Sequence, residues 1–374
     1  MRILLAGGGT GGHINPAISI ANEIKSHHPD TKFLFAATPN GMENILVPQA
    51  GYDVAHIKVA GFKRSLSPSN ILHNIKALSY LLTASKKAGK IIDDFKPDAV
   101  IGTGGYLSGP ILLSAQKRKI PTFLHEANAF PGVTTKALAK NAEVIMLAFE
   151  EAKKHLPEGK NYEVVGIPVR QSFMTTTKKE AREKLGLDDA FTILSFGGSQ
   201  GAVKINEIAA DIMKWHSADN KINHIHGYGK HGRDTFPQML KERNIDLSLY
   251  SRIEAKEYID NMNLYVAAAD LVISRAGAST IMELEVAGKP SILVPYPYAT
   301  ENHQYYNAKV LADKKASILV EEKNYDKEKL IQSLKELYEN RNLLAEFSKN
   351  ASELAVFDTN ERIYNIIMSK LGKN

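Results

Sequence analysis

Two glycine-rich turns are the parts of this sequence whose residue types and spacing could do chemistry. Residues 7–12 read GGGTGG and residues 197–201 read GGSQG, and each turn follows a short apolar run. Because glycine has no side chain, backbone N–H groups and the positive end of a following helix can approach an anion closely. The turns therefore predict phosphate-binding loops, and small-residue turns at 102–105 and 274–277 support the same interpretation.

Several classes of phosphate-binding protein do not fit these turns. The first turn matches a dinucleotide motif, but no acidic residue ends the next predicted strand, 32–37, to bind a ribose. The sequence also has no Gly-Lys-Ser/Thr loop and no Asp-x-Asp pattern for a metal-bound nucleotide sugar. A diphosphate would then need helix dipoles and cations. Arg170 and Arg275 stand beside such turns, and the alternative for either is an exposed salt bridge.

A serine hydrolase is the alternative function that the second turn supports. Residues 197–201 also fit Gly-x-Ser-x-Gly, the nucleophile elbow, between an expected strand and an expected helix. Asp270 and His303 follow Ser199 in the chain order of that catalytic triad. This interpretation leaves the glycines of the first half of the chain unexplained.

The histidines offer a general base but no metal site. His13 begins the helix after the first turn, where the helix dipole lowers the pKa of an imidazole and keeps it neutral near pH 7. The alternative is a histidine that only caps the helix. His224 and His226 share one face of a predicted strand, with His231 nearby, but no carboxylate is close in sequence. We therefore expect no metal.

Alternating strands and helices must position these turns. Such alternation predicts an α/β fold of two Rossmann-like domains with parallel sheets, whose turns face a central cleft between them. The expected domains are 1–166 and 190–354, joined by a polar linker at 167–189, with a last helix at about 355–374 packing back on the first domain. The expected strands lie at residues 3–6, 32–37, 98–101, 121–124, 144–147, 192–196, 222–226, 270–273 and 291–294.

Composition indicates the class of protein and its expected cellular location. Apolar residues make up 44 % and charged residues 24 %, which is typical of a globular protein. There is no cysteine, so disulfides and cysteine nucleophiles are excluded. The apolar start, residues 3–6, is too short for a signal peptide, and glycines interrupt the longest uncharged stretch, 99–116. We expect a cytoplasmic protein that does not cross a bilayer.

One stretch predicts contact with a membrane surface. Residues 71–85 carry an apolar stripe flanked by lysines, as in basic amphipathic helices that lie on anionic lipid. The alternative is an ordinary helix whose apolar side faces the core. Basic residues are not interleaved with aromatic ones, so nucleic acid is not an expected partner. The apolar residues of the stripe are Ile75, Leu78, Leu81 and Leu82.

Seven motifs in order resemble the family of peptidoglycan N-acetylglucosaminyltransferases. They extend from residue 7 to residue 308, so the resemblance covers most of the chain. One departure is Ala127, where the family usually has Gln, which concerns only fine specificity. The motifs are GGGTGGH at 7–13, TGGYLSGP at 103–110, HEANAFPG at 125–132, GIPVR at 166–170, GGSQGA at 197–202, SRAGA at 274–278 and HQYYNA at 303–308.

The resemblance implies a fold, a reaction and a location. The fold is the GT-B arrangement of two Rossmann-like domains. The reaction moves N-acetylglucosamine from UDP-N-acetylglucosamine to the 4-hydroxyl of undecaprenyl-diphospho-N-acetylmuramoyl-pentapeptide, with inversion and a β1→4 linkage. No metal or other cofactor takes part. The lipid-linked acceptor places the enzyme at the cytoplasmic face of the cell membrane, bound peripherally to anionic inner-leaflet lipid.

The resemblance also implies roles for individual residues. His13 is the first choice for the base that deprotonates the acceptor, and Glu126 is the second. Thr10, Gly11 and Gly12 would contact the donor and line the acceptor side with Tyr106 and Ser108. On the donor, Ser199 and Gln200 would contact the diphosphate, and Ile259 would contact the uracil through its backbone. Glu283 would bind the ribose, and the sugar would be held by Asn128, Ala278 and Gln304. Arg170 and Arg275 would approach the diphosphate or the sugar.

Overall fold

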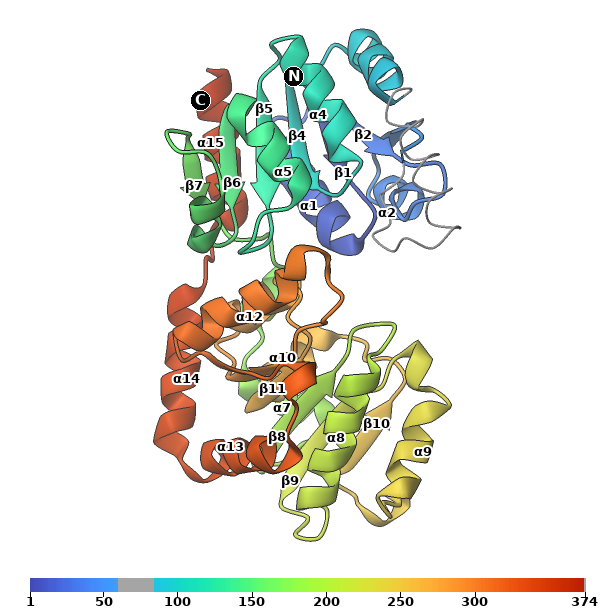
Figure 1. Cartoon of the computed structure of the whole chain (residues 1–374), viewed down its shortest axis with the longest axis vertical. Helices are drawn as coiled ribbons and strands as arrows, with labels where there is room; N and C mark the ends of the chain where they lie inside the picture. The colour runs from blue at the N-terminus through green and yellow to red at the C-terminus, as the bar shows by residue number, and fades with distance from the viewer. Residues whose placement is uncertain (60–83, 373–374) are drawn as a thin grey trace. The chain divides into compact units, whose positions relative to one another are not determined.

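The computed structural model describes residues 1–59 and 84–372 of the 374-residue chain. The chain divides into two compact units (Figure 1). Unit 1 comprises Met1–Pro168 and Asp358–Asn374, and unit 2 comprises Val169–Phe357. In the described residues each unit has a parallel β-sheet with helices on both faces, which confirms the predicted α/β class.

The described part of unit 1 has a sheet of seven parallel strands in the order β3-β2-β1-β4-β5-β6-β7. This is a Rossmann order, and ligands of such sheets bind beyond the carboxyl ends of the strands where the order reverses, here between β1 and β4. The elements are β1 (Arg2–Gly7), α1 (Gly11–His27), β2 (Lys32–Ala37), α2 (Glu43–Gln49), β3 (Asp53–His56), β4 (Ala99–Gly104), α4 (Ser108–Lys117), β5 (Thr122–Glu126), α5 (Val133–Leu138), β6 (Val144–Leu147), β7 (Tyr162–Val164) and α15 (Thr359–Leu371).

The central strand β1 is buried on both faces because consecutive residues are apolar. Ile3 and Leu5 pack with α1 and α15 on one face of the sheet, whereas Leu4 and Ala6 pack with α4 and the helical residues 84–95 on the other. Burial of each large aliphatic side chain contributes about 1.5–3 kcal/mol. This alternation fixes the register of β1 and places the first glycine turn at its carboxyl end.

Helix α15 returns to unit 1 at the end of the chain and packs on α1. Ile363 and Ile367 enter the core beside α1. At the end of α1, Nε2 of His28 lies 3.0 Å from the hydroxyl oxygen of Tyr364. The return that we predict for residues 355–374 is therefore made by a helix that begins at Thr359.

In its described residues, unit 2 repeats the arrangement with six parallel strands in the order β10-β9-β8-β11-β12-β13. The order reverses between β8 and β11, so the second glycine turn, after β8, occupies the place of the first. The elements are α6 (Gln171–Thr175), α7 (Lys178–Leu185), β8 (Phe191–Phe196), α8 (Val203–His216), β9 (Ile222–Gly227), α9 (Thr235–Glu242), β10 (Ile253–Lys256), α10 (Met262–Ala268), β11 (Leu271–Ser274), α11 (Ala278–Val286), β12 (Ser291–Leu293), α12 (His303–Asp313), β13 (Ser317–Leu319), α13 (Lys327–Glu339) and α14 (Arg341–Leu354).

Residues 167–189, which we predict as a linker, form helices α6 and α7 and belong almost entirely to unit 2. A capping box of Thr177 and Glu180 starts α7, and Gly186 ends it in the left-handed conformation at φ 67°. Ala181 is buried where α7 packs against α10. The segment is polar because most of α7 faces solvent, and its composition therefore resembles that of a linker.

The histidines of β9 belong to a chain of buried hydrogen bonds in the core of unit 2. Nε2 of His216 lies 3.1 Å from Nδ1 of His224, and the hydroxyl of Ser195 lies 2.8 Å from both Nε2 of His224 and Nδ1 of His226. Asn206 Oδ1 lies 3.1 Å from Nε2 of His226. Burial lowers the pKa of His216 to about 4 and that of His226 to about 3, so both are neutral near pH 7.

These neutral histidines predict that acid destabilises unit 2. Below pH 6.5 the unfolded chain binds protons that the folded core does not, so each histidine removes about 1.4 kcal/mol of stability per pH unit until its folded pKa is reached. The urea midpoint should fall as the pH is lowered from 7 to 5. The only tryptophan, Trp215, lies in unit 2 and reports the transition by fluorescence.

The matched variants are His216→Gln and His231→Gln. Loss of the buried His216 should reduce the dependence of the free energy of unfolding on pH by about one proton. His231→Gln, which removes an exposed histidine of the same unit, is the control for the substitution itself. Equal pH dependence in the wild type and His216→Gln would show that His216 titrates normally.

Candidate active site

Two glycine turns touch at the carboxyl edge of the unit 1 sheet. The first follows β1 and the other follows β4, and the N–H of Gly8 donates to the carbonyl of Gly104 at 3.4 Å. A Cβ atom on Gly105, which has φ 78°, would lie 2.3 Å from the carbonyl oxygen of Gly8. Only glycine permits this approach, and it brings residues 103–106 beside the start of α1.

His13 is held by Thr103 through both its ring and its backbone. The ring nitrogen Nδ1 lies 3.0 Å from the carbonyl oxygen of Thr103, and the Thr103 hydroxyl donates to the carbonyl of His13 at 2.7 Å. Because a carbonyl only accepts, Nδ1 carries the proton and Nε2 is left as an acceptor.

The pKa of His13 is lowered, as we predict, but for a different main reason. Burial of the ring lowers it most, whereas the nearby Glu126 charge and the bond to Thr103 raise it. We predict the direction of the shift from the helix dipole, whereas the largest cause in the structure is loss of solvent around the ring. The imidazole is thus neutral near pH 7 with one lone pair available.

Glu126 ends β5 and organises the loop that follows it. Its buried carboxylate accepts from the backbone N–H and the side-chain amide of Asn128, at 3.0 and 3.1 Å. It also accepts from the N–H of Gly132 at 3.0 Å and the hydroxyl of Thr135 at 2.5 Å. Four donors therefore share its two carboxylate oxygens. Both Asn128 donors bind Oε1, which fixes Asn128 in place.

Tyr106 and Ser108 have different surroundings although they are two residues apart. Tyr106 is 42 % exposed, and partial burial and then the Glu43 charge raise the pKa of its phenol. Ser108 is buried, and its hydroxyl lies 2.5 Å from the carbonyl oxygen of Ala6 and 2.7 Å from that of Gly104. Ser108 therefore joins the ends of β1 and β4. Thr10 and Gly12 are exposed at the start of α1, and Gly11 is half-buried.

The second glycine turn, after β8, is exposed at Ser199 and Gln200. Their carbonyls accept from the N–H groups of Lys230 and His231, at 3.4 and 2.9 Å, so the loop after β9 supports the turn. A Cβ atom on Gly201, at φ 82°, would lie 2.2 Å from the carbonyl oxygen of Tyr228. The turn leads into α8, whose first turn has no acidic residue.

Four further predicted residues lie around the same edge of unit 2. Ile259 follows β10 and is buried against Gly227, the last residue of β9. Burial raises the pKa of Glu283, on α11, to about 7, and the charge of Arg170 opposes the shift. Arg170 precedes α6, which packs against α11. Ala278 is the first residue of α11.

Arg275 is already engaged within unit 2. Its guanidinium donates to the carbonyls of Val294 and Pro295, at 3.0 and 3.1 Å, and pairs with Glu322 at 2.5 Å. The structure therefore favours the salt-bridging alternative over a diphosphate contact. Gln304 is also engaged, because its Oε1 accepts from the N–H of Tyr296 at 2.9 Å, which leaves its NH₂ group as a donor.

The serine hydrolase alternative is wrong, because its residues lie at opposite edges of the unit 2 sheet. Ser199 follows the carboxyl end of β8, whereas Asp270 precedes the parallel strand β11. Asp270 Oδ2 accepts from the N–H of Thr192 and from Arg182, both at 2.8 Å, near the start of β8. A strand of six residues spans about 16–20 Å, so no triad with Ser199 and His303 forms.

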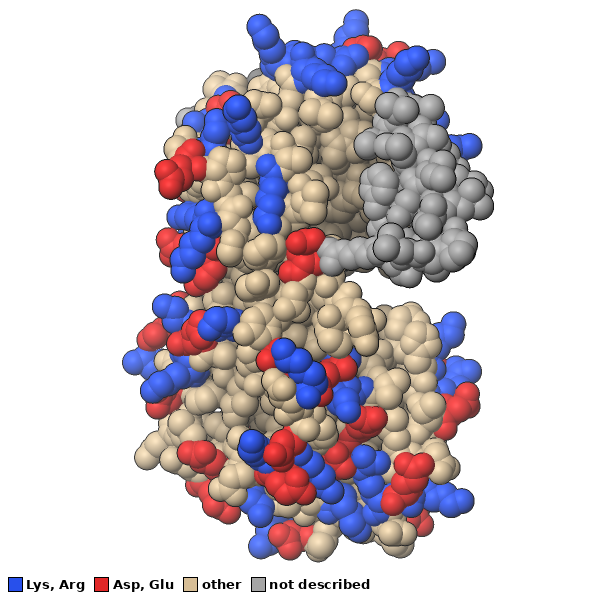
Figure 2. Space-filling model, viewed as in Figure 1, with Lys and Arg blue, Asp and Glu red and all other residues tan. Residues whose placement is uncertain are grey.

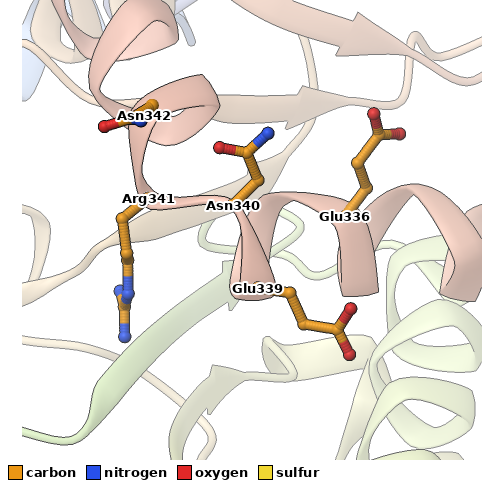
Figure 3. Close-up of a pocket in the computed structure, with 5 residues that line it drawn as sticks. All are labelled: Glu336, Glu339, Asn340, Arg341 and Asn342. Carbon is orange, nitrogen blue, oxygen red and sulfur yellow. The ribbon is translucent and has the colours of Figure 1, made fainter.

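A surface pocket of about 420 Å³ lies where α13 meets α14 (Figure 3) and is not assigned as the site. The Arg341 guanidinium at this junction lies over the ring of Phe191, 5.1 Å from its centroid, and Phe191 begins β8. The pocket is therefore at the amino edge of the sheet, opposite the glycine turn. It is lined by Glu336, Glu339, Asn340, Arg341 and Asn342.

Three further observations concern metals and membranes. The described residues contain no cluster of three or more side chains that could hold a metal ion. No helix in residues 1–59 or 84–372 is long and apolar enough to cross a bilayer. The predicted membrane stripe lies outside the described residues, namely Ile75, Leu78, Leu81 and Leu82.

Two Rossmann-type units, each with a glycine turn where its strand order reverses, define the GT-B fold class. Residues 3–147 match the glycosyltransferase family 28 N-terminal domain, and residues 192–363 match the family 28 C-terminal domain. The chain belongs to glycosyltransferase family 28.

Near-full-length relatives carry one functional name, UDP-N-acetylglucosamine--N-acetylmuramyl-(pentapeptide) pyrophosphoryl-undecaprenol N-acetylglucosamine transferase. The protein from Desulforamulus reducens is 41 % identical over 95 % of this chain and 94 % of its own length. That from Acetivibrio thermocellus is 41 % identical over 98 % and 97 %. The crystal structure of Acinetobacter baumannii MurG matches with a TM-score of 0.80 and 29 % identity, covering 98 % of this chain and 99 % of that one.

Two residues of the candidate site escape prediction from the sequence. Thr103, which orients His13, is the last residue but one of β4, and nothing in its sequence spacing from His13 shows the contact. Glu43 begins a short helix 34 positions after Gly9, and its side chain lies against the first glycine turn. Both contacts join segments that only the sheet brings together.

Two histidines of unit 1 are hydrogen-bonded to backbone carbonyl oxygens and should adopt opposite tautomers. His13 should carry its proton on Nδ1, whereas His125, whose Nε2 lies 2.8 Å from the carbonyl oxygen of Gly166, should carry it on Nε2. Burial lowers the pKa of both, so both should be neutral at pH 7. Nitrogen-15 shifts of the imidazole rings, assigned with single His→Gln variants, distinguish the tautomers. An Nε2 proton on His13 would contradict the assignment of its free lone pair.

Proposed function

We propose that this glycosyltransferase moves N-acetylglucosamine from UDP-N-acetylglucosamine to the 4-hydroxyl of undecaprenyl-diphospho-N-acetylmuramoyl-pentapeptide, forming a β1→4 linkage with inversion in peptidoglycan synthesis. The observation that carries the proposal is 41 % identity, over nearly the full length of both chains, to proteins named for this reaction. The positions of the glycine turns and of His13 support the same chemistry.

We assign the donor to unit 2. The exposed turn at Ser199 and Gln200, followed by the amino end of α8, offers backbone donors to a diphosphate. Arg170 supplies positive charge near Glu283, and Glu283 accepts from the ribose hydroxyls. Ile259 presents its backbone to uracil, while Ala278 and Gln304 face the sugar. These donors stabilise the charge that develops on UDP as it leaves.

We assign the acceptor to the carboxyl edge of unit 1, with His13 as the general base. Its Nε2 lone pair takes the proton of the acceptor 4-hydroxyl as that oxygen attacks the anomeric carbon of the sugar. The bond between the anomeric carbon and the UDP oxygen breaks, and UDP leaves with the electron pair. Thr10, Gly11, Gly12 and Tyr106 line this side.

We assign Glu126 a role other than that of general base, for which it is the second choice from the sequence. Its two oxygens already accept from four donors, so it holds Asn128 toward the sugar and stabilises the imidazolium that forms on His13 by its charge. A carboxylate that gave up those bonds to take a proton would release the loop from Asn128 to Thr135. His13 is therefore the better base.

We propose that the enzyme works at the inner face of the cell membrane, bound peripherally to anionic lipid. Lys86, Lys87 and Lys90 are exposed on the helical residues 84–95, next to the apolar stripe of the sequence. Figure 2 shows that Lys and Arg side chains gather at the end of unit 1 that is drawn uppermost. Such a basic face attracts anionic lipid headgroups, and the lipid-linked acceptor requires access to that surface.

Turnover with a lipid-linked acceptor tests the proposed reaction. Purified protein should release UDP from UDP-N-acetylglucosamine only when the acceptor is present, and EDTA should not reduce the rate. His13→Ala should lower kcat by about 100-fold or more, because general-base catalysis contributes 10²–10⁴-fold. Affinity for UDP should change less than twofold.

The matched control is His27→Ala, which removes a histidine from the other end of the same helix. It should leave kcat within about twofold of the wild type. Unchanged turnover in His13→Ala would remove His13 as the base, and absence of any acceptor-dependent UDP release in the wild type would refute the proposed reaction.

Sedimentation with vesicles tests the membrane proposal. Replacing Lys86, Lys87 and Lys90 by Gln should weaken binding to vesicles that contain anionic phospholipid by at least tenfold, since each basic residue near such a surface contributes about 1 kcal/mol. The control replaces three exposed lysines of unit 2, Lys329, Lys335 and Lys349. Equal loss in both variants would mean that net charge, and not this face, drives binding.

A further inference from the structure

Glu43 is a fully buried acidic residue that contacts the first glycine turn. It has no exposed surface, and its Oε1 accepts from the N–H of Gly9 at 3.0 Å. Its other oxygen, Oε2, is buried without a hydrogen-bond partner. A buried polar atom left in this state costs about 1–3 kcal/mol, so the position of this carboxyl calls for an explanation.

The chain leaves space for this carboxyl at two glycines. A Cβ atom on Gly8 would lie 2.1 Å from Oε1 of Glu43, and a Cβ atom on Gly41 would lie 1.7 Å from Oε2. Any larger residue at either position would push the carboxyl away from the turn. Two glycines from separate segments thus permit one side chain to reach the N–H of Gly9.

Gly9, which Glu43 contacts, lies immediately before the N-cap residue of α1. Gly9 is at φ 89°, in the left-handed region, and it precedes Thr10, the N-cap of α1. The carbonyl of Thr10 accepts the first helical bonds, from the N–H groups of His13 and Ile14, at 3.1 and 3.2 Å. The conformation of Gly9 therefore sets where α1 begins and where His13 stands.

The two glycine turns of the protein are held in different ways. In unit 2, backbone groups support the turn: the N–H of Gly201 donates to the carbonyl of Gly198 at 2.9 Å, and Lys230 and His231 donate to the next two carbonyls. In unit 1, a carboxyl from α2 takes the N–H of Gly9, which then cannot turn toward a ligand. The difference concerns the unit to which we assign the acceptor.

We propose that Glu43 is a positioning residue for the transfer reaction: by accepting from Gly9 it fixes the glycine turn in the form that places Thr10 and His13 for the acceptor. The effect on acceptor kinetics rests on the proposed function, whereas the effect on the turn does not. Glu43 acts only through the backbone and does not contact the acceptor. Because we assign the donor mainly to unit 2, its KM should change less than that of the acceptor.

Hydrogen–deuterium exchange of the glycine-turn peptide, followed by mass spectrometry, tests the contact without reference to activity. Glu43→Ala removes the acceptor, and exchange at the turn should become at least tenfold faster. Glu43→Gln keeps an oxygen of the same reach and should retain most of the protection. Gly41→Ala leaves Glu43 in place but displaces its carboxyl, so it should behave like Glu43→Ala.

The kinetic experiment measures kcat and both KM values for the same variants. Glu43→Ala and Gly41→Ala should lower kcat/KM for the acceptor by about 10- to 100-fold, because a displacement near 1 Å can cost this much. KM for UDP-N-acetylglucosamine should stay within twofold, and Glu43→Gln should restore most of the rate. Glu143→Ala, which removes an exposed carboxylate of the same unit, is the control and should behave as the wild type.

The outcomes separate this proposal from the proposed function. Unchanged exchange and unchanged acceptor kinetics in both Glu43→Ala and Gly41→Ala would overturn the positioning role, as would an equal loss for donor and acceptor accompanied by a lower Tm. If Glu43→Ala does not fold, Gly41→Ala and Glu43→Gln still decide. If the wild type transfers no sugar, the proposed function fails, while exchange at the turn still shows whether Glu43 holds Gly9.

Discussion

The hydrogen bond between His13 Nδ1 and the carbonyl of Thr103 is the interaction on which the candidate chemistry of unit 1 depends. It gives the imidazole one tautomer and leaves Nε2 as a hydrogen-bond acceptor. The bond forms only because two glycine turns approach each other, since Gly105 leaves room for the carbonyl of Gly8. Burial of the ring then keeps it neutral, so the same packing that orients the imidazole also lowers its pKa.

Buried carboxyl groups hold the loops of both units in place. Glu126 gathers four donors and fixes Asn128, and Glu43 takes the N–H of Gly9. At the opposite edge of unit 2, Asp270 joins Arg182 to the start of β8. Removing a partner from such a group is costly because a buried charge or acceptor is left unpaired. These groups therefore limit how far the loops at the strand ends can move, which is what a reaction between two positioned substrates requires.

The sequence by itself determined the fold class and the central strands. Apolar runs at 32–37 and 144–147 are strands with those same bounds. Edge strands such as β3, β7 and β13 escaped prediction because they are short and only partly buried, which weakens their apolar pattern. The polar composition of 167–189 indicated a linker, although it reflects the exposed face of α7. The glycine turns and His13 could also be identified as candidate site residues, because local residue types and spacing are enough to indicate them.

Tertiary structure decided which of the predicted residues are available. Arg275 and Ser108 satisfy carbonyls or a carboxylate of their own unit, and Glu126 serves its loop, although each stands in a motif beside a strand end. A parallel sheet places residues on the same edge only when they follow the same ends of strands, so Ser199 and Asp270 are far apart despite their order in the chain. Glu43 acquires its contact with the first turn by the pairing of β1 with β2. The spacing of these residues in the sequence does not predict their separations in space, because strand order and packing determine those separations.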